Sequence, residues 1–197
     1  MQHNAPVTVV FVSGGLGSGK TLFTQLCAKH GAKTLNADEI VKDLYESDSQ
    51  MLHELQEILG PEIVDRNGVV NKKLIASKIF SRDSLRQEVE AVIHPRVQSR
   101  LLNESNNSEL LVYEIPVLNS KTNLDLADYV VVVDAPEELR IERAVTRGMD
   151  IEDAKSRINA QKSNLIVPEN AIVISNTGSQ EELEESAVKF LAMVAND

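Results

Sequence analysis

Hydrophobic residues along the chain gather in short runs that are typical of buried β-strands. The first run, at 7–13, is apolar and β-branched, with no alternation between polar and apolar positions. Similar runs follow at 110–115 and 129–133, with shorter candidates at 33–35 and 171–175. A continuous apolar run indicates a strand that is covered on both faces. The pattern therefore predicts a parallel sheet packed between layers of helices.

Between these runs, apolar residues recur at helical spacing. Helices are predicted at 21–30, 49–59, 72–103, 137–147, 151–162 and 180–194. Gly31 is well placed to end the first of them in a left-handed conformation. Strands that alternate with helices favour a three-layer α/β fold with a parallel sheet. No strong strand is found between Asp38 and Glu109, so we expect one domain with a helical insertion of about seventy residues.

Composition narrows the class of protein. The 197 residues include 20 Lys and Arg against 30 Asp and Glu, which gives a formal net charge of −10. This negative charge disfavours binding to nucleic acid or to an anionic membrane. No apolar run approaches the ~18 residues that a membrane span needs, and the first six residues lack the pattern of a signal peptide. The single cysteine, Cys27, excludes an internal disulfide, is expected to be buried and suits the reducing cytoplasm.

Positive charge is nevertheless concentrated in one part of the chain, which we call the basic segment. Residues 66–100 hold eight basic and three acidic residues, a local balance of +5. Such a segment can arise by chance, or it can mark the place where an anionic small molecule binds.

A glycine-rich turn lies directly after the first predicted strand. Its sequence, Gly14-Gly15-Leu16-Gly17-Ser18-Gly19-Lys20-Thr21, matches the phosphate-binding pattern G-x-x-x-x-G-K-[ST] at every fixed position. Glycines let the backbone turn its N–H groups around a phosphate, and the following helix directs its positive end to the same point. Lys20 would reach the β- and γ-phosphates, and the Thr21 hydroxyl would bind Mg²⁺. Because the turn lies between a buried strand and a helix, it predicts nucleoside triphosphate binding rather than a flexible linker.

Three acidic residues lie near the carboxyl ends of predicted strands, where open parallel sheets bind their ligands. They are Asp38, Glu114 and Asp134. A carboxylate at this edge can hold Mg²⁺ or accept a proton from an attacking hydroxyl. Structural roles remain open: Asp38 could cap a helix that begins near Glu39, Asp134 could serve a turn or a helix cap, and Glu114 could form an ion pair.

Arg140, Arg143 and Arg147 are spaced to share one face of a predicted helix. No carboxylate lies three or four positions from Arg143, so salt bridges within the helix do not explain it. A phosphate would offset the repulsion between these like charges through charge-assisted hydrogen bonds. The alternative is a solvated basic face. Arg157 and Gln161, one turn apart on the next helix, could face the same ligand.

Together these features resemble the dephospho-coenzyme A kinase family over nearly the whole chain. The matching motifs are Gly14 to Thr21, Asn36-Ala37-Asp38, Lys72 and Lys73 with Ile79-Phe80, Val92-Ile93-His94-Pro95, Glu114-Ile115-Pro116-Val117-Leu118, Arg140 to Arg147, Arg157-Ile158 with Gln161, and Ile174-Ser175-Asn176. The resemblance implies a single domain with the P-loop kinase fold. Its core would lie at about 1–44 and 108–197, with a helical substrate-binding insertion at about 45–107 and a helical lid at about 140–165.

The resemblance also implies an activity and its residues. The family transfers the γ-phosphoryl group of ATP, with Mg²⁺, to the ribose 3′-hydroxyl of dephospho-CoA, the last step of CoA synthesis. Catalysis would use Asp38 as general base together with Lys20 and Arg143. The ATP site would comprise Gly15, Leu16, Gly17, Ser18, Gly19, Lys20, Thr21, Arg143, Arg147 and Asn176, with Asn176 near the adenine and Thr21 on the metal. The dephospho-CoA site would comprise Asp38, Lys72, Lys73, His94, Pro95, Pro116 and Arg140.

Several positions depart from the family pattern. Asn36 replaces the first aspartate of Asp-Ala-Asp, Lys72 replaces a usual arginine, Asn119-Ser120 replaces a usual glutamate, and Arg140 stands where glutamine is frequent. These departures are expected to affect how the substrate is bound rather than the type of reaction. Two alternatives stay open: another P-loop kinase of a small metabolite such as a nucleoside or nucleotide, and a nucleotide-binding regulatory module with weakened catalysis. The protein is expected in the cytoplasm, as a monomer or weak homo-oligomer.

Overall fold

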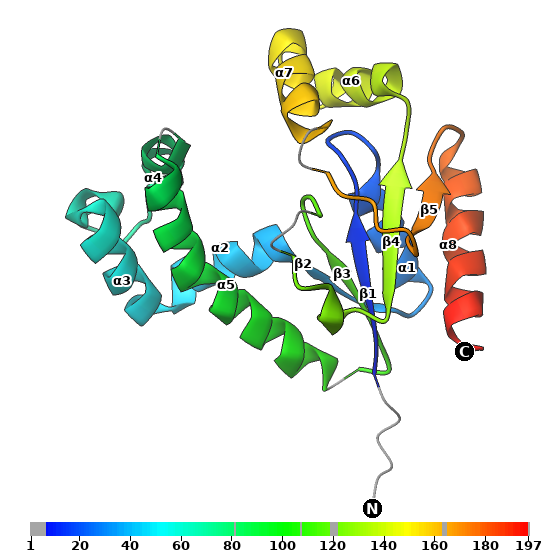
Figure 1. Cartoon of the computed structure of the whole chain (residues 1–197), viewed down its shortest axis with the longest axis horizontal. Coiled ribbons are helices and arrows are strands. Elements are labelled where there is room, and N and C mark those ends of the chain that lie inside the picture. Colours follow the sequence, from blue (N-terminus) through cyan, green and yellow to red (C-terminus); the bar gives the residue numbers. More distant parts are fainter. Residues whose placement is uncertain (1–6, 81, 107, 119–121, 163–164, 197) are drawn as a thin grey trace, which may run out of the picture. The chain divides into compact units, whose positions relative to one another are not determined.

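The structure is a computed structural model that describes residues 7–80, 82–106, 108–118, 122–162 and 165–196. Its contacts divide the chain into two compact units, whose helices and strands are drawn in Figure 1. The first unit comprises Met1–Asn36 and Glu104–Asp197, and the second comprises Ala37–Asn103. The second unit is therefore one continuous segment inserted into the sequence of the first.

A five-stranded parallel sheet forms the centre of the first unit, in the order β2-β3-β1-β4-β5. The strands are β1 (Thr8–Ser13), β2 (Lys33–Asn36), β3 (Leu110–Glu114), β4 (Tyr129–Asp134) and β5 (Ile172–Ser175). Five of the six β1 residues are buried, so both faces of this central strand are covered, as its continuous apolar run predicted. Val12 pairs with Glu114, and Asp134 pairs with Ser175, which gathers polar residues at the carboxyl edge of the sheet.

Helices α1 (Lys20–Lys29) and α8 (Gln180–Val194) pack together in the first unit. The ring centroids of Phe23 and Phe190 lie 6.0 Å apart at this contact. Cys27 is fully buried in the same core, which confirms the prediction from the sequence. Burial raises the pKa of its thiol to about 12 because the thiolate would be removed from water.

Two further helices, α6 (Glu137–Thr146) and α7 (Ile151–Lys162), lie beyond the carboxyl ends of the strands of this unit (Figure 1). They contact each other, and Lys162 forms an ion pair with Glu137. Both helices fall largely within 140–165, the segment that the family resemblance assigns to a lid.

The second unit is helical. Its elements are α2 (Ala37–Ser47), α3 (Ser49–Leu59), a short 3₁₀ turn at Pro61–Ile63, α4 (Lys72–Phe80) and most of α5 (Asp83–Ser105). A second 3₁₀ turn, Leu124–Leu126, belongs to the first unit. Its core contains Met51, Leu55, Leu59, Ile63, Ile75, Val89 and Ile93. The stretch 72–103, predicted as helical, is two helices. Among the described residues of this unit no strand is present, apart from a single bridge between Val64 and Val70.

The parallel α/β class predicted from the alternation of strands and helices is confirmed. Helix α2 begins at Ala37, directly after the last residue of β2 and two residues before the helix start near Glu39 that the sequence suggested. Within the described part of the chain, no helix combines the length and the apolar character needed to cross a membrane.

Candidate active site

The phosphate-binding loop connects β1 to α1 within the first unit. Gly19 precedes the helix with φ of 99° and has no side chain that could cap it. An uncapped helix N-terminus presents N–H groups and a partial positive charge to an anion. Lys20, half-buried, and Thr21, exposed, begin the helix at this point. The local structure is therefore suited to a phosphate group, as the motif predicted.

Three side chains hold one face of this loop, which we call its outer face, through three successive backbone carbonyls. The hydrogen bonds are Arg140 Nε to the Leu16 oxygen (2.9 Å), Arg143 Nη1 to the Gly17 oxygen (3.4 Å) and Asn176 Nδ2 to the Ser18 oxygen (2.8 Å). We call Arg140, Arg143 and Asn176 the carbonyl brace. The first two come from α6, and Asn176 directly follows β5.

Close packing on the outer face explains two glycines of the loop. Gly17 has φ of +76°, and a Cβ there would lie 2.3 Å from the Arg140 carbonyl oxygen. Gly19 has φ of +99°, and a Cβ there would lie 2.0 Å from Asn176 Nδ2. Both positions need glycine for backbone conformation and also for the close approach of a neighbour. Only the first of these reasons could be inferred from the motif.

The helix α7 also reaches the loop. Gln161 Oε1 accepts a hydrogen bond of 2.7 Å from the Leu16 N–H group. Arg157, one turn earlier, instead forms a 3.1 Å ion pair with Asp153 on its own helix. Of the two residues noted on this predicted helix, Gln161 is therefore the one that the structure brings to the loop.

The predicted arginine face is divided between the loop and solvent. Arg140 is buried against the loop, with 8% of its surface exposed. Arg143 Nη2 donates to the backbone oxygen of Asn176 at 3.1 Å and to its Oδ1 at 3.4 Å. Arg147 follows the last residue of α6 and is exposed. Arg140 and Arg143 therefore contact the loop, as their shared helix face suggested, and Arg147 is left accessible to a ligand from solvent.

A buried carboxylate lies beside the start of α1. Glu114, at the end of β3, is 4% exposed, and its Oε1 accepts a 2.7 Å hydrogen bond from Thr21 Oγ1. Asp134, at the end of β4, is exposed, and Pro136 rather than Asp134 is the N-cap of α6.

The hydroxyl and carboxylate of this pair fit a magnesium ion. Among the described residues, no three His, Cys, Asp or Glu side chains cluster so as to hold a metal by themselves. Mg²⁺ commonly uses one or two protein oxygens together with waters and substrate phosphates. Thr21 and Glu114 offer such a pair next to the phosphate-binding loop.

Asp38, the expected base, lies exposed in the first turn of α2, in the second unit. It does not cap the helix from outside, because α2 begins at Ala37. It follows β2 by two residues, and Asn36, the last residue of that strand, pairs with Glu114 at the carboxyl edge of the sheet.

Four residues that the resemblance assigns to dephospho-CoA lie on α4 and α5 of the second unit. Lys72, Lys73, His94 and Pro95 are all exposed. Lys72 Nζ lies 5.6 Å from the centre of the Tyr45 ring, a cation–π contact that orients the ammonium group. Exposed side chains of this kind are accessible to a ligand from solvent.

Two further residues of the expected dephospho-CoA site belong to the first unit. Pro116 is exposed two residues after β3. Arg140 is instead buried against the phosphate-binding loop. Asn119 and Ser120, where the family glutamate is missing, lie outside the described residues.

Several basic residues of the basic segment, among them Lys78, Arg86 and Arg96, are paired with carboxylates of the second unit. The pairs are Lys78 with Glu62, Arg86 with Asp83 and Glu90, and Arg96 with Asp48 and Glu54. The Met51 N–H group and the Arg96 guanidinium hold the pKa of Asp48 below its usual value. Part of the positive charge counted along the sequence therefore serves the packing of helices.

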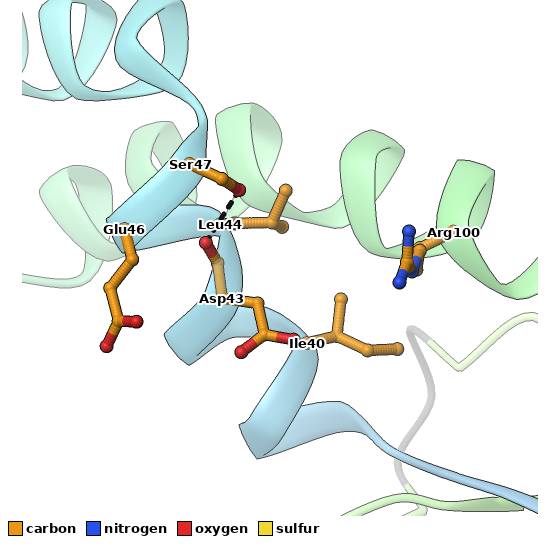
Figure 2. Close-up of a pocket in the computed structure, with 6 residues that line it drawn as sticks. All are labelled: Ile40, Asp43, Leu44, Glu46, Ser47 and Arg100. Carbon is orange, nitrogen blue, oxygen red and sulfur yellow. Dashed lines mark hydrogen bonds between the residues drawn. The ribbon is translucent and has the colours of Figure 1, made fainter.

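The second unit also contains a pocket of about 370 Å³ that sequence reasoning did not identify. Ile40, Asp43, Leu44, Glu46 and Ser47 of α2 line it together with Arg100 of α5 (Figure 2). Ser47 Oγ donates a 2.7 Å hydrogen bond to the Asp43 carbonyl oxygen, as Figure 2 shows. The available signal was the helical spacing of the two apolar residues, which fixes which face of α2 turns inward.

Comparison with known proteins identifies the family. The family model for dephospho-CoA kinase matches residues 8–182. Dephospho-CoA kinases from Thermobifida fusca and Corynebacterium jeikeium are 32% identical over 180 residues and 33% identical over 186. These alignments cover 89% and 91% of this chain, and 90% and 95% of the relatives. The crystal structure of TT1252 from Thermus thermophilus matches with a TM-score of 0.80 at 28% identity, covering 96% of this chain and 98% of that one.

The phosphate-binding loop, the parallel sheet and the near full-length matches agree with one another. The fold is that of the P-loop kinases, and the chain belongs to the dephospho-CoA kinase family.

Proposed function

We propose that this phosphotransferase moves the γ-phosphoryl group of ATP to the ribose 3′-hydroxyl of dephospho-CoA, which forms CoA and releases ADP as the bond from the γ-phosphorus to the bridging oxygen breaks. The observation that carries the proposal is the loop itself, with its uncapped helix start, Lys20 at its end and the Thr21–Glu114 pair beside it. Family membership supports dephospho-CoA as the acceptor.

The donor side of the reaction rests on the first unit. The inner N–H groups of the loop and the Lys20 ammonium bind the β- and γ-phosphates. Thr21 and Glu114 would hold Mg²⁺, which supplies positive charge to the phosphate oxygens when bound. Phosphoryl transfer mainly requires that the reacting groups are positioned and that the charge on the transferring phosphoryl group is stabilised. The loop, Lys20 and the Thr21–Glu114 pair meet most of these requirements.

The acceptor side rests on Asp38 as general base. Its exposed carboxylate is available to take the proton of the 3′-hydroxyl as that oxygen attacks phosphorus. Arg143 supplies positive charge to the transferring group. Its guanidinium donates to backbone oxygens in this structure, so a change of its side-chain rotamer would be needed to reach a phosphate.

The remaining expected contacts divide by exposure. Lys72, Lys73, His94, Pro95 and Pro116 are exposed and are proposed to contact dephospho-CoA, and Arg147 is exposed and is proposed to contact ATP. Arg140 and Asn176 are buried against the loop, which favours a different role for them.

An acceptor panel tests the reaction. The protein is incubated with ATP and Mg²⁺ and, in separate samples, dephospho-CoA, adenosine, a set of nucleosides and nucleoside monophosphates, or no acceptor. CoA formation with dephospho-CoA as the preferred acceptor is the expected result. Faster turnover of a nucleoside or nucleotide would instead establish the small-metabolite kinase alternative. Tight ATP binding with no acceptor turned over would establish the regulatory alternative.

We propose further that the protein acts in the cytoplasm, as a monomer or weak homo-oligomer, without a nucleic-acid partner. The net charge of −10 supports the last point because it repels a phosphate backbone. Sedimentation velocity across a range of concentrations tests the oligomeric state, and a stable dimer at low concentration would contradict it.

A further inference from the structure

We propose that Arg140 and Asn176 are positioning residues that set the geometry of the phosphate-binding loop, rather than residues that touch dephospho-CoA or adenine. Through the carbonyl brace they hold the peptide planes of the loop from outside. The inference rests on polyphosphate binding by the loop and does not depend on the identity of the acceptor.

The peptide bonds of the loop are trans and planar. In such a unit the carbonyl of one residue and the N–H of the next point in opposite directions. Fixing the Leu16 and Ser18 carbonyls on the outer face therefore directs the N–H groups of Gly17 and Gly19 toward the inner side. These are the groups that a phosphate-binding loop turns toward its ligand.

Glycine makes an external restraint necessary. Gly17 and Gly19 both have positive φ. Because glycine has no Cβ, steric contacts within the residue do not favour one backbone conformation over another. A loop rich in glycine would sample many directions of its N–H groups unless its neighbours fixed them. Hydrogen bonds from Arg140 and Asn176 supply that restraint before any ligand binds.

Burial separates Arg140 and Asn176 from a direct role in binding. Arg140 is 8% exposed and Asn176 is 5% exposed, so neither presents a free surface to a large substrate. Both ends of the Asn176 amide are engaged, since Nδ2 donates to Ser18 and Oδ1 accepts from Arg143. Its backbone N–H donates to the Asp134 carbonyl oxygen at 2.8 Å, which anchors the residue to the end of β4.

Two glycines of the loop, Gly15 and Gly19, lie directly against the side chains of Arg140 and Asn176. A Cβ on Gly15 would lie 2.0 Å from Arg140 Nη2, and one on Gly19 would lie 2.0 Å from Asn176 Nδ2. The side chains of Arg140 and Asn176 thus pack directly on the backbone of the loop. Glycine at these two positions leaves the space that the two side chains occupy.

Inorganic tripolyphosphate separates the possible roles, because it has the phosphates of ATP without adenine or ribose. Calorimetry measures Mg²⁺-tripolyphosphate and Mg²⁺-ATP binding to the full chain and to Asn176→Leu, which removes the donor without adding charge. The structure leads us to expect that both ligands weaken by the same factor, about 5- to 100-fold, because the Ser18 carbonyl loses its partner. Asn170→Leu, at an exposed asparagine, is the matched control.

Arg140 is tested with two variants, since its charge alone attracts phosphates. Arg140→Met removes charge and donors, whereas Arg140→Lys keeps the charge but not the planar donor group. Both are expected to weaken tripolyphosphate and to leave the KM for dephospho-CoA unchanged. Arg157→Met, at an exposed arginine, controls for general loss of positive charge.

Each role predicts a different outcome. If Asn176→Leu weakens ATP but not tripolyphosphate, Asn176 contacts adenine and the proposal is overturned. If the Arg140 variants raise only the KM for dephospho-CoA, or if Arg140→Lys binds like the wild type, the same conclusion holds for Arg140. A measurement on the wild-type protein guards against variants that do not fold: without ligand, the Gly17 and Gly19 amides should be as rigid on the ps–ns timescale as those of α1. A loop that is mobile without ligand would contradict the brace.

Discussion

The phosphate-binding loop and the basic segment are both proposed to bind anions, but they use different chemical groups to do so. The loop uses backbone N–H groups, set by glycine and held on the outer face by buried side chains. The basic segment uses side chains: Lys72 and Lys73 are exposed, whereas Lys78, Arg86 and Arg96 are paired with carboxylates.

The two kinds of anion site differ in how well the local sequence identifies them. A backbone site depends on residue types at fixed spacing, so a motif identifies it well. A site made of flexible charged side chains depends on which of them find a partner in the folded chain. Charge counted along the sequence therefore locates such a surface without telling which residues contact a ligand.

The largest effect is expected at Asp38, a single exposed side chain that belongs neither to the phosphate-binding loop nor to the basic segment. Its variant tests whether one side chain outside both regions is essential for turnover. Asp38→Asn keeps the shape of the side chain but removes its capacity to accept a proton. We expect kcat to fall by about 10²–10⁴-fold while the ATP dissociation constant is unchanged. Glu39→Gln, at the other acidic residue in the first turn of α2, is the control. Turnover like that of the wild type in Asp38→Asn would exclude it as the base.

The Thr21–Glu114 pair tests whether the loop acts alone or with the adjacent strand. Glu114→Gln preserves an acceptor for the Thr21 hydroxyl but removes the negative charge. The Mg²⁺ concentration needed for half-maximal ATP binding, measured by calorimetry, should rise by about 10- to 100-fold. Asp134→Asn, at an exposed carboxylate of the same sheet edge, should leave it unchanged. Equal behaviour of the two variants would remove Glu114 from the metal site.

Glycine substitutions separate backbone conformation from outer-face packing. Gly17 and Gly31 have φ of +76° and +97°, but a Cβ at Gly31 would meet nothing within 4 Å. Gly31→Ala should therefore cost only the conformational strain, about 1–2 kcal/mol of unfolding free energy, without altering ATP affinity. Gly17→Ala should cost more and also weaken ATP, because it displaces α6 at Arg140. Equal effects of both variants on ATP affinity would show that outer-face packing is unimportant.

The smallest expected effects lie in the basic segment. Lys73→Met should raise the KM for dephospho-CoA by about fivefold or less, since an exposed charge contributes at most about 1 kcal/mol. Unfolding free energy and ATP affinity should not change. An unchanged KM in the double variant Lys72→Met/Lys73→Met would place the acceptor elsewhere.

Arg96 gives the matching contrast within the same segment. Arg96→Met should lower the free energy of unfolding rather than raise a KM, because Arg96 pairs with Asp48 and Glu54. The pKa of Asp48 is depressed in the folded state, so its contribution to stability is present above its unfolded value of about 3.9 and is lost as pH falls below it. The stability deficit should therefore be present at pH 7 and shrink in acid. A constant deficit across this range in denaturant titrations would contradict the pairing.

Local pattern predicted the sheet and the loop well. The strand predicted at 110–115 is Leu110–Glu114, and the one predicted at 129–133 is Tyr129–Asp134. Both are continuous apolar runs, and burial on both faces leaves little choice of conformation. Gly31 adopts the predicted left-handed conformation for a similarly local reason.

Contacts between distant elements could not be predicted in the same way. The helical spacing of Arg140 indicated a face but not that its donor would reach the Leu16 carbonyl, 124 positions away. Gln161 was noted as a candidate for the ligand, whereas its amide oxygen accepts from the loop backbone. Such bonds depend on where α6 and α7 pack, which no local propensity encodes.

The buried thiol of Cys27 bears on the chemistry of the proposed substrate. Dephospho-CoA and CoA both end in a thiol, and their oxidised forms exchange with accessible protein thiolates to give mixed disulfides. Cys27 is the single cysteine of the chain, is fully buried, and with a pKa of about 12 has almost no thiolate at neutral pH. The folded protein therefore offers no accessible cysteine thiolate to an oxidised coenzyme, and its activity should survive thiol stress that inactivates enzymes with exposed cysteines.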